Sequence, residues 1–318
     1  MSPSRNYLER CSAETGFQIG ALEKVARLGE MAADIGRHPF LGTVLALKGG
    51  SALNLCFGPP MRLSVDLDYN YVGHLDRDKM LADRVRVEEA VVELARRKGY
   101  RTQRSADAFA GRKLYLAFSS VLGRTERIEV DLNFLFRDPL AGTVTMEMWQ
   151  PGELDRPQVR VVSPEELCTG KLLALLDRTA ARDVWDAGKL PTMAGAPLAS
   201  PLFRPLFVAL SATLDHPLDS YEQQHLEARF ADRGVAQQLV PMLAGGEKPR
   251  AGELIKGAWA VLRPFLHLEP REKEYIEAIH RGEVRAGLLF PDDAERSERI
   301  ARHPAIQWKI LNVRKRTK

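Results

Sequence analysis

The period of the hydrophobic pattern changes at Ser163, and this change limits the folds open to the chain more than any other feature. Upstream, short runs that alternate apolar and polar residues are interleaved with runs of helical period. Downstream, apolar residues recur at helical spacing between prolines, and no clear run of strand period follows residue 186. The pattern predicts an α/β (α+β) domain over residues 1–162, with a mixed sheet and flanking helices, and a mainly helical domain over residues 163–318.

The composition is that of a globular protein. Of the 318 residues, 45% are hydrophobic and 28% are charged, which excludes a disordered or fibrous chain. The longest uncharged stretches, such as residues 190–203, are broken by prolines and glycines and are shorter than the ~20 apolar residues of a membrane span. The first residues are polar and lack the apolar core of a secretory signal. We therefore expect no membrane partner and no signal peptide.

Cysteine usage points to a reducing compartment. Cys11, Cys56 and Cys168 are far apart and form no Cys-x-x-Cys pair. Three cysteines without such spacing support neither a disulfide framework nor a zinc cluster. We expect a cytoplasmic protein that acts as a monomer.

The charge distribution allows a polyanionic partner without requiring one, since the net charge is only +4. The basic excess is concentrated near the C-terminus, where it forms either a solvated tail or a contact to a phosphate backbone. The tail residues are Arg314, Lys315, Arg316 and Lys318.

Several segments have apolar residues at the clear spacing of a helix or a strand. Helices are predicted over residues 15–35 and 80–98, the second ending at Gly99. Ser163-Pro164-Glu165-Glu166 has the form of a capping box with proline at the first helical position, which predicts a helix from there through residue 176. Strands are predicted over residues 43–47, 63–69, 113–118, 127–134 and 158–162, with a hairpin turn at Gly123-Arg124.

A glycine turn follows the first of these strands. Lys48-Gly49-Gly50-Ser51 leads from the strand into a short helix, which Gly58-Pro59-Pro60 ends. Glycines let a backbone approach phosphate oxygens closely and offer amide donors, and the Ser51 hydroxyl adds another donor. The turn is a candidate phosphate site.

Two carboxylates lie on the next strand. Asp66 and Asp68 are two residues apart, so both point to the same face, where a hard divalent cation such as Mg²⁺ would relieve their repulsion. Asp131 alternates in the same way on the strand 127–134 and would supply a third carboxylate if the two strands are neighbours. Metal ions held in this way can bridge triphosphate oxygens and activate an attacking hydroxyl.

The run LKGGSALNLCFGPPMRLSVDLDYNY resembles the minimal nucleotidyltransferase signature of AbiEii/AbiGii-type toxins of bacterial toxin–antitoxin systems, which include the MenT-like tRNA nucleotidyltransferase toxins. The resemblance continues in Glu165-Glu166-Leu167 with Lys171 and in the segment 182–186, RDVWD, and it covers roughly residues 47–190. The spacer between Ser51 and Asp66 is slightly longer than is usual in the family, and the Gly58-Pro59-Pro60 turn accommodates it.

The resemblance implies a nucleotidyltransferase-like sheet and a reaction in which Mg²⁺, or Mn²⁺, supports transfer of a nucleoside monophosphate from an NTP. The expected acceptor is the 3′ end of tRNA, and the transfer would block aminoacylation and growth until a cognate antitoxin intervenes. The implied catalytic residues are Asp66, Asp68, Lys171 and Asp183, and the implied metal ligands are Asp66, Asp68 and Asp131. The implied nucleotide-binding residues are Gly49, Gly50, Ser51, Arg62, Ser64, Lys171 and Arg182.

Each candidate also has a purely structural interpretation. Asp131 can serve solubility on an exposed strand, Arg62 can hold a loop through a carboxylate, and Ser64 can be a strand-face hydroxyl. Lys171 can extend a cation from an otherwise apolar helix. The charges of residues 182–186 can form ordinary ion pairs on a helix face.

Three other functions use similar residues. A nucleotidyltransferase that modifies an aminoglycoside shares the Gly-Ser turn and the Asp-x-Asp pair, as does an enzyme that modifies a protein hydroxyl. A non-enzymatic module with the same fold is the third, but it has no physical need to keep repelling carboxylates together.

Overall fold

The computed structural model describes residues 3–193 and 195–316, which form two compact units. Unit 1 contains the described residues up to Arg137, together with Thr143–Val162 and Val240–Lys248. Unit 2 contains Asp138–Gly142, Ser163–Leu239 and the described residues from Pro249 onward. The segment Asp138–Gly142 lies before residue 163 but belongs to unit 2, and Val240–Lys248 lies after it but belongs to unit 1. The domain boundary at residue 163 stays a prediction.

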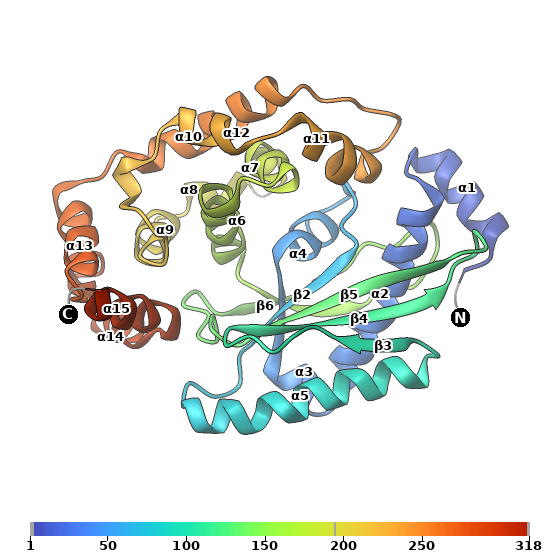
Figure 1. Cartoon of the computed structure of the whole chain (residues 1–318), viewed down its shortest axis with the longest axis horizontal. Coiled ribbons are helices and arrows are strands. Elements are labelled where there is room, and N and C mark those ends of the chain that lie inside the picture. Colours follow the sequence, from blue (N-terminus) through green and yellow to red (C-terminus); the bar gives the residue numbers. More distant parts are fainter. Residues whose placement is uncertain (1–2, 194, 317–318) are drawn as a thin grey trace. The chain divides into compact units, whose positions relative to one another are not determined.

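Unit 1 is built on a mixed sheet. Within the described residues its seven strands have the order β3-β4-β5-β2-β1-β7-β6 (Figure 1). The pairs β2/β5 and β1/β7 are parallel and the others are antiparallel. This confirms the predicted α/β class. The strands are β1 (Leu45–Lys48), β2 (Asp66–Tyr71), β3 (Arg101–Arg104), β4 (Gly111–Ser119), β5 (Thr125–Asn133), β6 (Thr143–Glu147) and β7 (Gln158–Val162).

The strands β2, β4 and β5 bury one face and leave the other polar. Leu67, Leu114 and Leu132 alternate with polar neighbours and are fully buried. Two long helices, α2 (Ile19–Arg37) and α5 (Arg77–Arg97), cover this apolar face (Figure 1). The opposite, open face therefore carries every second residue of these strands, and these residues are mostly polar.

The predicted helices of unit 1 are present, and α1 (Arg5–Thr15) is additional. Gly16, with a φ of 75°, ends α1 in the left-handed conformation that favours glycine and separates it from α2. The remaining helices of unit 1 are the single turn α3 (Leu41–Val44) and α4 (Gly49–Cys56).

Three predicted boundaries around the glycine turn are wrong. The strand predicted over 43–47 starts only at Leu45, because residues 41–44 form the turn α3. The turn predicted over 48–51 is instead the beginning of α4, which starts at Gly49. The strand predicted from Leu63 starts at Asp66, because the Leu63 N–H donates to the Met242 carbonyl oxygen at 2.8 Å, outside the sheet.

Unit 2 is helical. In the described part of the chain no strand follows β7, apart from an isolated bridge at Leu243 in unit 1. No described helix is long and apolar enough to cross a membrane. The helices are α6 (Pro164–Arg178), α7 (Ala181–Met193), α8 (Gly195–Ala199), α9 (Phe203–Ser211), α10 (Gln223–Arg229), α11 (Asp232–Gly234), α12 (Ala251–Leu266), α13 (Pro270–His280), α14 (Ala294–Arg302) and α15 (Pro304–Arg316).

The capping box predicted at the start of α6 is only half formed. The Ser163 hydroxyl accepts a hydrogen bond from the Glu166 N–H at 3.2 Å, as predicted. The Ser163 N–H instead donates to the Gly142 carbonyl oxygen at 3.0 Å, and the Glu166 carboxylate accepts from the Ala141 N–H at 3.0 Å. The first turn of α6 therefore binds the loop 138–142 rather than closing on itself.

Candidate active site

The glycine turn packs directly against the second carboxylate of the Asp-x-Asp pair. Gly49 has a φ of 67°, and a Cβ at this position would overlap the Asp68 carboxylate. Only glycine satisfies both conditions. A Cβ on Gly50 would lie 3.0 Å from the Ser64 hydroxyl oxygen and 3.2 Å from the Arg62 guanidinium, so this turn also leaves no space on its other side.

The three predicted carboxylates lie on one face of two adjacent strands. In the parallel pair β2/β5, Asp68 is in register with Asp131, and Asp66 is in register with Glu129. Since residues two apart share a face, all four carboxylates project from the open face of the sheet. Burial, and then repulsion by Asp68, raise the pKa of Asp131 above its ordinary value, against the opposing charges of Lys113 and Lys48.

Two lysines flank this acidic edge, and the sequence analysis gave neither of them a role of its own. Lys113 on β4 is in register with Asp131, and its Nζ lies 3.5 Å from Asp131 Oδ2 and 3.8 Å from Glu129 Oε2. Lys48 at the end of β1 is in register with Asp68. The predicted hairpin contained a usable signal, because a turn at Gly123 already places residue 113 close to residue 131.

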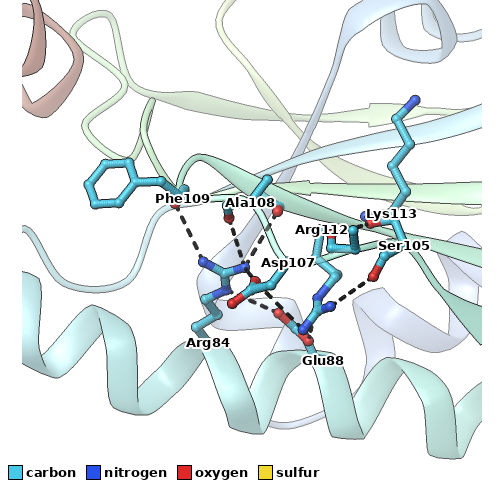
Figure 2. A network of polar contacts seen from close by, with 10 residues as sticks. Arg84, Glu88, Ser105, Asp107, Ala108, Phe109, Arg112 and Lys113 are labelled. Atoms are coloured by element: carbon cyan, nitrogen blue, oxygen red, sulfur yellow. Dashed lines mark hydrogen bonds and ion pairs between the residues drawn. The ribbon is translucent and has the colours of Figure 1, made fainter.

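The start of β4 is fixed on the covered face of the sheet (Figure 2). Arg84 of α5 donates to the carboxylate of Glu88 and to the carbonyl oxygen of Ala108, at 3.1 and 3.0 Å, and it also binds the Asp107 carboxylate at 2.5 Å. Arg112 is paired with Glu88 at 3.3 Å. Figure 2 shows that the Lys113 side chain points away from this network. The network thus holds the strand that presents Lys113 to the opposite, open face.

The polar residues behind the glycine turn are buried. Ser51 is fully buried, and its hydroxyl donates to the Asp66 carbonyl oxygen, which ties α4 to β2. Arg62 is 1% exposed and donates to the Leu63 carbonyl oxygen at 2.8 Å, and Ser64 is 3% exposed. The contacts predicted for these three side chains with a nucleotide stay predictions, and the structure shows them supporting the turn.

In unit 2, Lys171 lies between two aspartates. Its Nζ is 2.9 Å from Asp183 Oδ1 and 2.8 Å from Asp186 Oδ2, and all three side chains are buried. Arg178, which the sequence analysis did not single out, donates to Asp183 Oδ2 at 2.6 Å. Burial alone would raise the pKa of Asp183, but Lys171 and Arg178 outweigh it and hold the pKa well below its usual range.

The sequence itself decides the family. Residues 34–261 match the profile of the nucleotidyl transferase AbiEii toxin family of type IV toxin–antitoxin systems, which is more than half of the 318 residues. The chain belongs to the AbiEii nucleotidyltransferase toxin family. A comparison with curated proteins gives no significant match.

One solved structure agrees with this AbiEii assignment at the level of the fold. The nucleotidyltransferase toxin MenT4 from Mycobacterium tuberculosis H37Rv superposes with a TM-score of 0.63 and 16% sequence identity, over 98% of this chain and 99% of MenT4. An antigenic nucleotidyltransferase-like protein from Paracoccidioides brasiliensis gives a TM-score of 0.35 and 16% identity, over 76% of this chain and 97% of that protein. The first similarity confirms the predicted nucleotidyltransferase-like fold.

The predicted residues of this AbiEii-family toxin fall into two groups. Asp66, Asp68 and Asp131 lie with the glycine turn in unit 1. Lys171 and the acidic residues of α7 lie together in unit 2, where Arg182 is half-buried next to Asp183 on α7. The catalytic, nucleotide-binding and metal-binding roles of these residues stay predictions.

The acidic edge has the donor chemistry that a divalent metal requires, but its side chains are not gathered around one point. Within the described residues, no group of three or more His, Cys, Asp or Glu side chains is placed to hold a metal ion. Carboxylate oxygens are the ligands that Mg²⁺ prefers. Lys113 supplies the compensating charge here. Burial alone would lower the pKa of Lys113, but Asp131, Glu129 and Asp68 outweigh it and raise the pKa above its ordinary value.

Proposed function

We propose that this AbiEii-family toxin transfers a nucleoside monophosphate from an NTP to the 3′ end of tRNA: the terminal hydroxyl forms a bond to the α-phosphate and pyrophosphate leaves. The added nucleotide blocks aminoacylation and arrests growth. The observation that carries the proposal is the register of β2 and β5, which brings Asp66, Asp68 and Asp131 to one open face beside the Gly49 turn. We further propose that the toxin acts as a monomer in the cytoplasm, where NTPs and tRNA are available, and that a cognate antitoxin restrains it.

We propose Asp66, Asp68 and Asp131 as the ligands of Mg²⁺, or of Mn²⁺ in its place. A divalent ion bound there would supply Lewis-acid stabilisation of the triphosphate and activation of the acceptor hydroxyl. The chain itself contributes positioning. The amides of Gly49, Gly50 and Ser51 would hold phosphate oxygens, and the buried Arg62 and Ser64 keep that turn in place.

We propose that the charged cluster of unit 2 takes part in nucleotide binding. The Lys171 ammonium is a compact cation that suits phosphate oxygens, and Asp183 would orient it. Arg182, next to Asp183, would add a second cation for the triphosphate. A triphosphate that approaches Lys171 would compete with Asp183 and Asp186 for its three N–H donors.

The acceptor class is tested by following label from each of the four α-phosphate-labelled NTPs in separate reactions with total tRNA, an aminoglycoside or the purified protein alone, with Mg²⁺ present. We expect label in tRNA with one or two of the NTPs. Label in the aminoglycoside or in the protein itself would replace tRNA by a small-molecule or protein acceptor. No label in any of the three acceptors would contradict the proposed reaction.

A further inference from the structure

The strands β3, β4 and β5 run side by side in the sheet (Figure 1). A groove lies on the open face of these strands. Its volume is about 460 Å³, and it is lined by residues that include Arg101, Gln103, Tyr115, Ala117 and Arg127. We call it the β3–β5 groove. None of the residues that line it is among those proposed above for nucleotide or metal binding.

The sheet register explains why the groove is hollow. Ala117 of β4 is in register with Arg101 on β3 and with Arg127 on β5. A small side chain therefore forms the floor between two long guanidinium side chains. Gln103 and Tyr115 are in register one step further along the same face and form the next row.

The walls suit a single strand of nucleic acid. Arg101 and Arg127 are exposed, and the Arg127 guanidinium lies over the Tyr115 ring, 4.6 Å from its centre, and 3.1 Å from the Glu129 carboxylate. Single-stranded nucleic acids bind to proteins through cations that follow the phosphates and through aromatic rings on which bases stack. Glu126 also lines the groove, but it is in register with Phe118 and points to the other face of the sheet, where its carboxylate is paired with Lys24 at 2.9 Å and with Arg124 at 2.6 Å.

The groove and the proposed metal edge lie on the same face of β5. Arg127, Glu129 and Asp131 follow one another on the open face of β5, so Arg127 and Asp131 are about 13 Å apart along the strand. Glu129 is in register with Tyr115 on one side and with Asp66 on the other. A single-stranded nucleic acid that lies over β5 can therefore place its phosphates in the groove and its terminal hydroxyl at the carboxylates of the proposed metal edge.

We propose that the β3–β5 groove binds the single-stranded 3′ end of the RNA acceptor, with Arg101 and Arg127 on phosphates and Tyr115 under a base. This inference rests on the proposed function and adds where the acceptor binds. The guanidinium groups of Arg101 and Arg127 favour binding of a polyanion, and they disfavour a polycationic acceptor such as an aminoglycoside.

The test measures binding of a fluorescently labelled tRNA acceptor minihelix by anisotropy, without NTP, over a range of salt concentrations. The double variant Arg101→Gln with Arg127→Gln should bind at least tenfold more weakly, and its salt slope should fall by about 1.4, since each single-strand phosphate contact contributes about 0.7. Tyr115→Leu should weaken binding about tenfold and leave the salt slope unchanged.

Arg104→Gln is the matched control. Arg104 is exposed on the same strand as Arg101, but it is in register with Leu114 and points to the other face. Its minihelix affinity should stay within about twofold of wild type. All these variants change side chains that are exposed or half-exposed, and their melting temperatures should equal that of the wild type.

Labelled NTP binding and label transfer into tRNA are measured in the same variants. The inference predicts unchanged NTP affinity and a raised KM for tRNA with kcat retained. Wild-type minihelix affinity in the groove variants would overturn the inference and leave the proposed function standing if the wild type transfers label. Loss of NTP affinity alone would make the groove a nucleotide site. A wild type that binds no minihelix would overturn the inference, whereas one that binds it but transfers no label would contradict the proposed function alone.

Discussion

At the scale of single residues, Lys113 controls the charge of the acidic edge. Its Nζ approaches Asp131 at 3.5 Å while its side chain is half-exposed, so it competes with any metal ion for the same carboxylate. We expect Lys113→Met to bind Mn²⁺ several-fold more tightly than the wild type, because a competing cation is removed. Titration of free Mn²⁺ by electron paramagnetic resonance measures this directly.

Lys24→Met is the control for this change, because Lys24 pairs with Glu126 on the same sheet and away from Asp131. It should leave Mn²⁺ affinity unchanged. Weaker Mn²⁺ binding by Lys113→Met would show that Lys113 holds the carboxylates in position instead of competing with the metal.

At the scale of elements, the pairing of α6 with α7 depends on a buried ion network. Lys171→Met leaves Asp183 and Asp186 buried without their shared cation, and we expect a loss of about 3–5 kcal/mol in the free energy of unfolding. Arg178→Gln should cost less than about 1 kcal/mol, because that side chain is 64% exposed. Urea unfolding of the two variants separates these values. Equal small losses would contradict the stabilising role of the Lys171 ion network.

The start of α6 should also make stability depend on pH. Burial raises the pKa of Glu166 from 4.5 to about 8, against hydrogen bonds from the loop 138–142. A carboxyl group with a raised pKa binds its proton more tightly in the folded state, so stability falls as pH rises from about 4.5 to 8. Urea unfolding of the wild type should show this fall, and Glu166→Gln should show less of it. Glu165→Gln is the control. The same dependence of the free energy of unfolding on pH in all three proteins would contradict the raised pKa of Glu166.

The elements that the sequence predicted are those with strong local patterns. The helix α5 and the β4/β5 hairpin follow from periodicity and from turn residues, and the hairpin register then places Asp131 beside Asp68. The strands β3 (Arg101–Arg104) and β6 (Thr143–Glu147) are short, polar strands at the two edges of the sheet, and they lack a buried alternation that a sequence can reveal. The late start of β2 depends on a contact with residue 242, which no local pattern announces.

The residues of the candidate site also fall into those that the sequence reveals and those that only the folded structure reveals. The carboxylates and glycines are visible in the sequence because their spacing is local. The cations Lys113 and Arg178, and the burial of Arg62, depend on contacts that only the folded chain brings together.

At the scale of the whole molecule, unit 1 needs a segment from far along the chain. Leu243 is 2% exposed and forms an isolated bridge with Arg62, and the Gly245 N–H donates to the Gly16 carbonyl oxygen at 3.0 Å. A fragment of residues 1–162 should therefore melt at a lower temperature than the same fragment with residues 240–248 joined through a flexible linker. Identical melting temperatures would support the boundary at residue 163 as sufficient for folding.

The central claim is that the carboxylates on β2 and β5 perform nucleotidyl transfer. It is tested most directly by the rate of label transfer from the preferred NTP into tRNA for Asp68→Asn, compared with wild type and with Asp78→Asn, whose side chain is 92% exposed. We expect Asp68→Asn to fold normally and to lose activity on the order of 10³-fold, while Asp78→Asn keeps the wild-type rate. Transfer by Asp68→Asn at the wild-type rate would contradict the account.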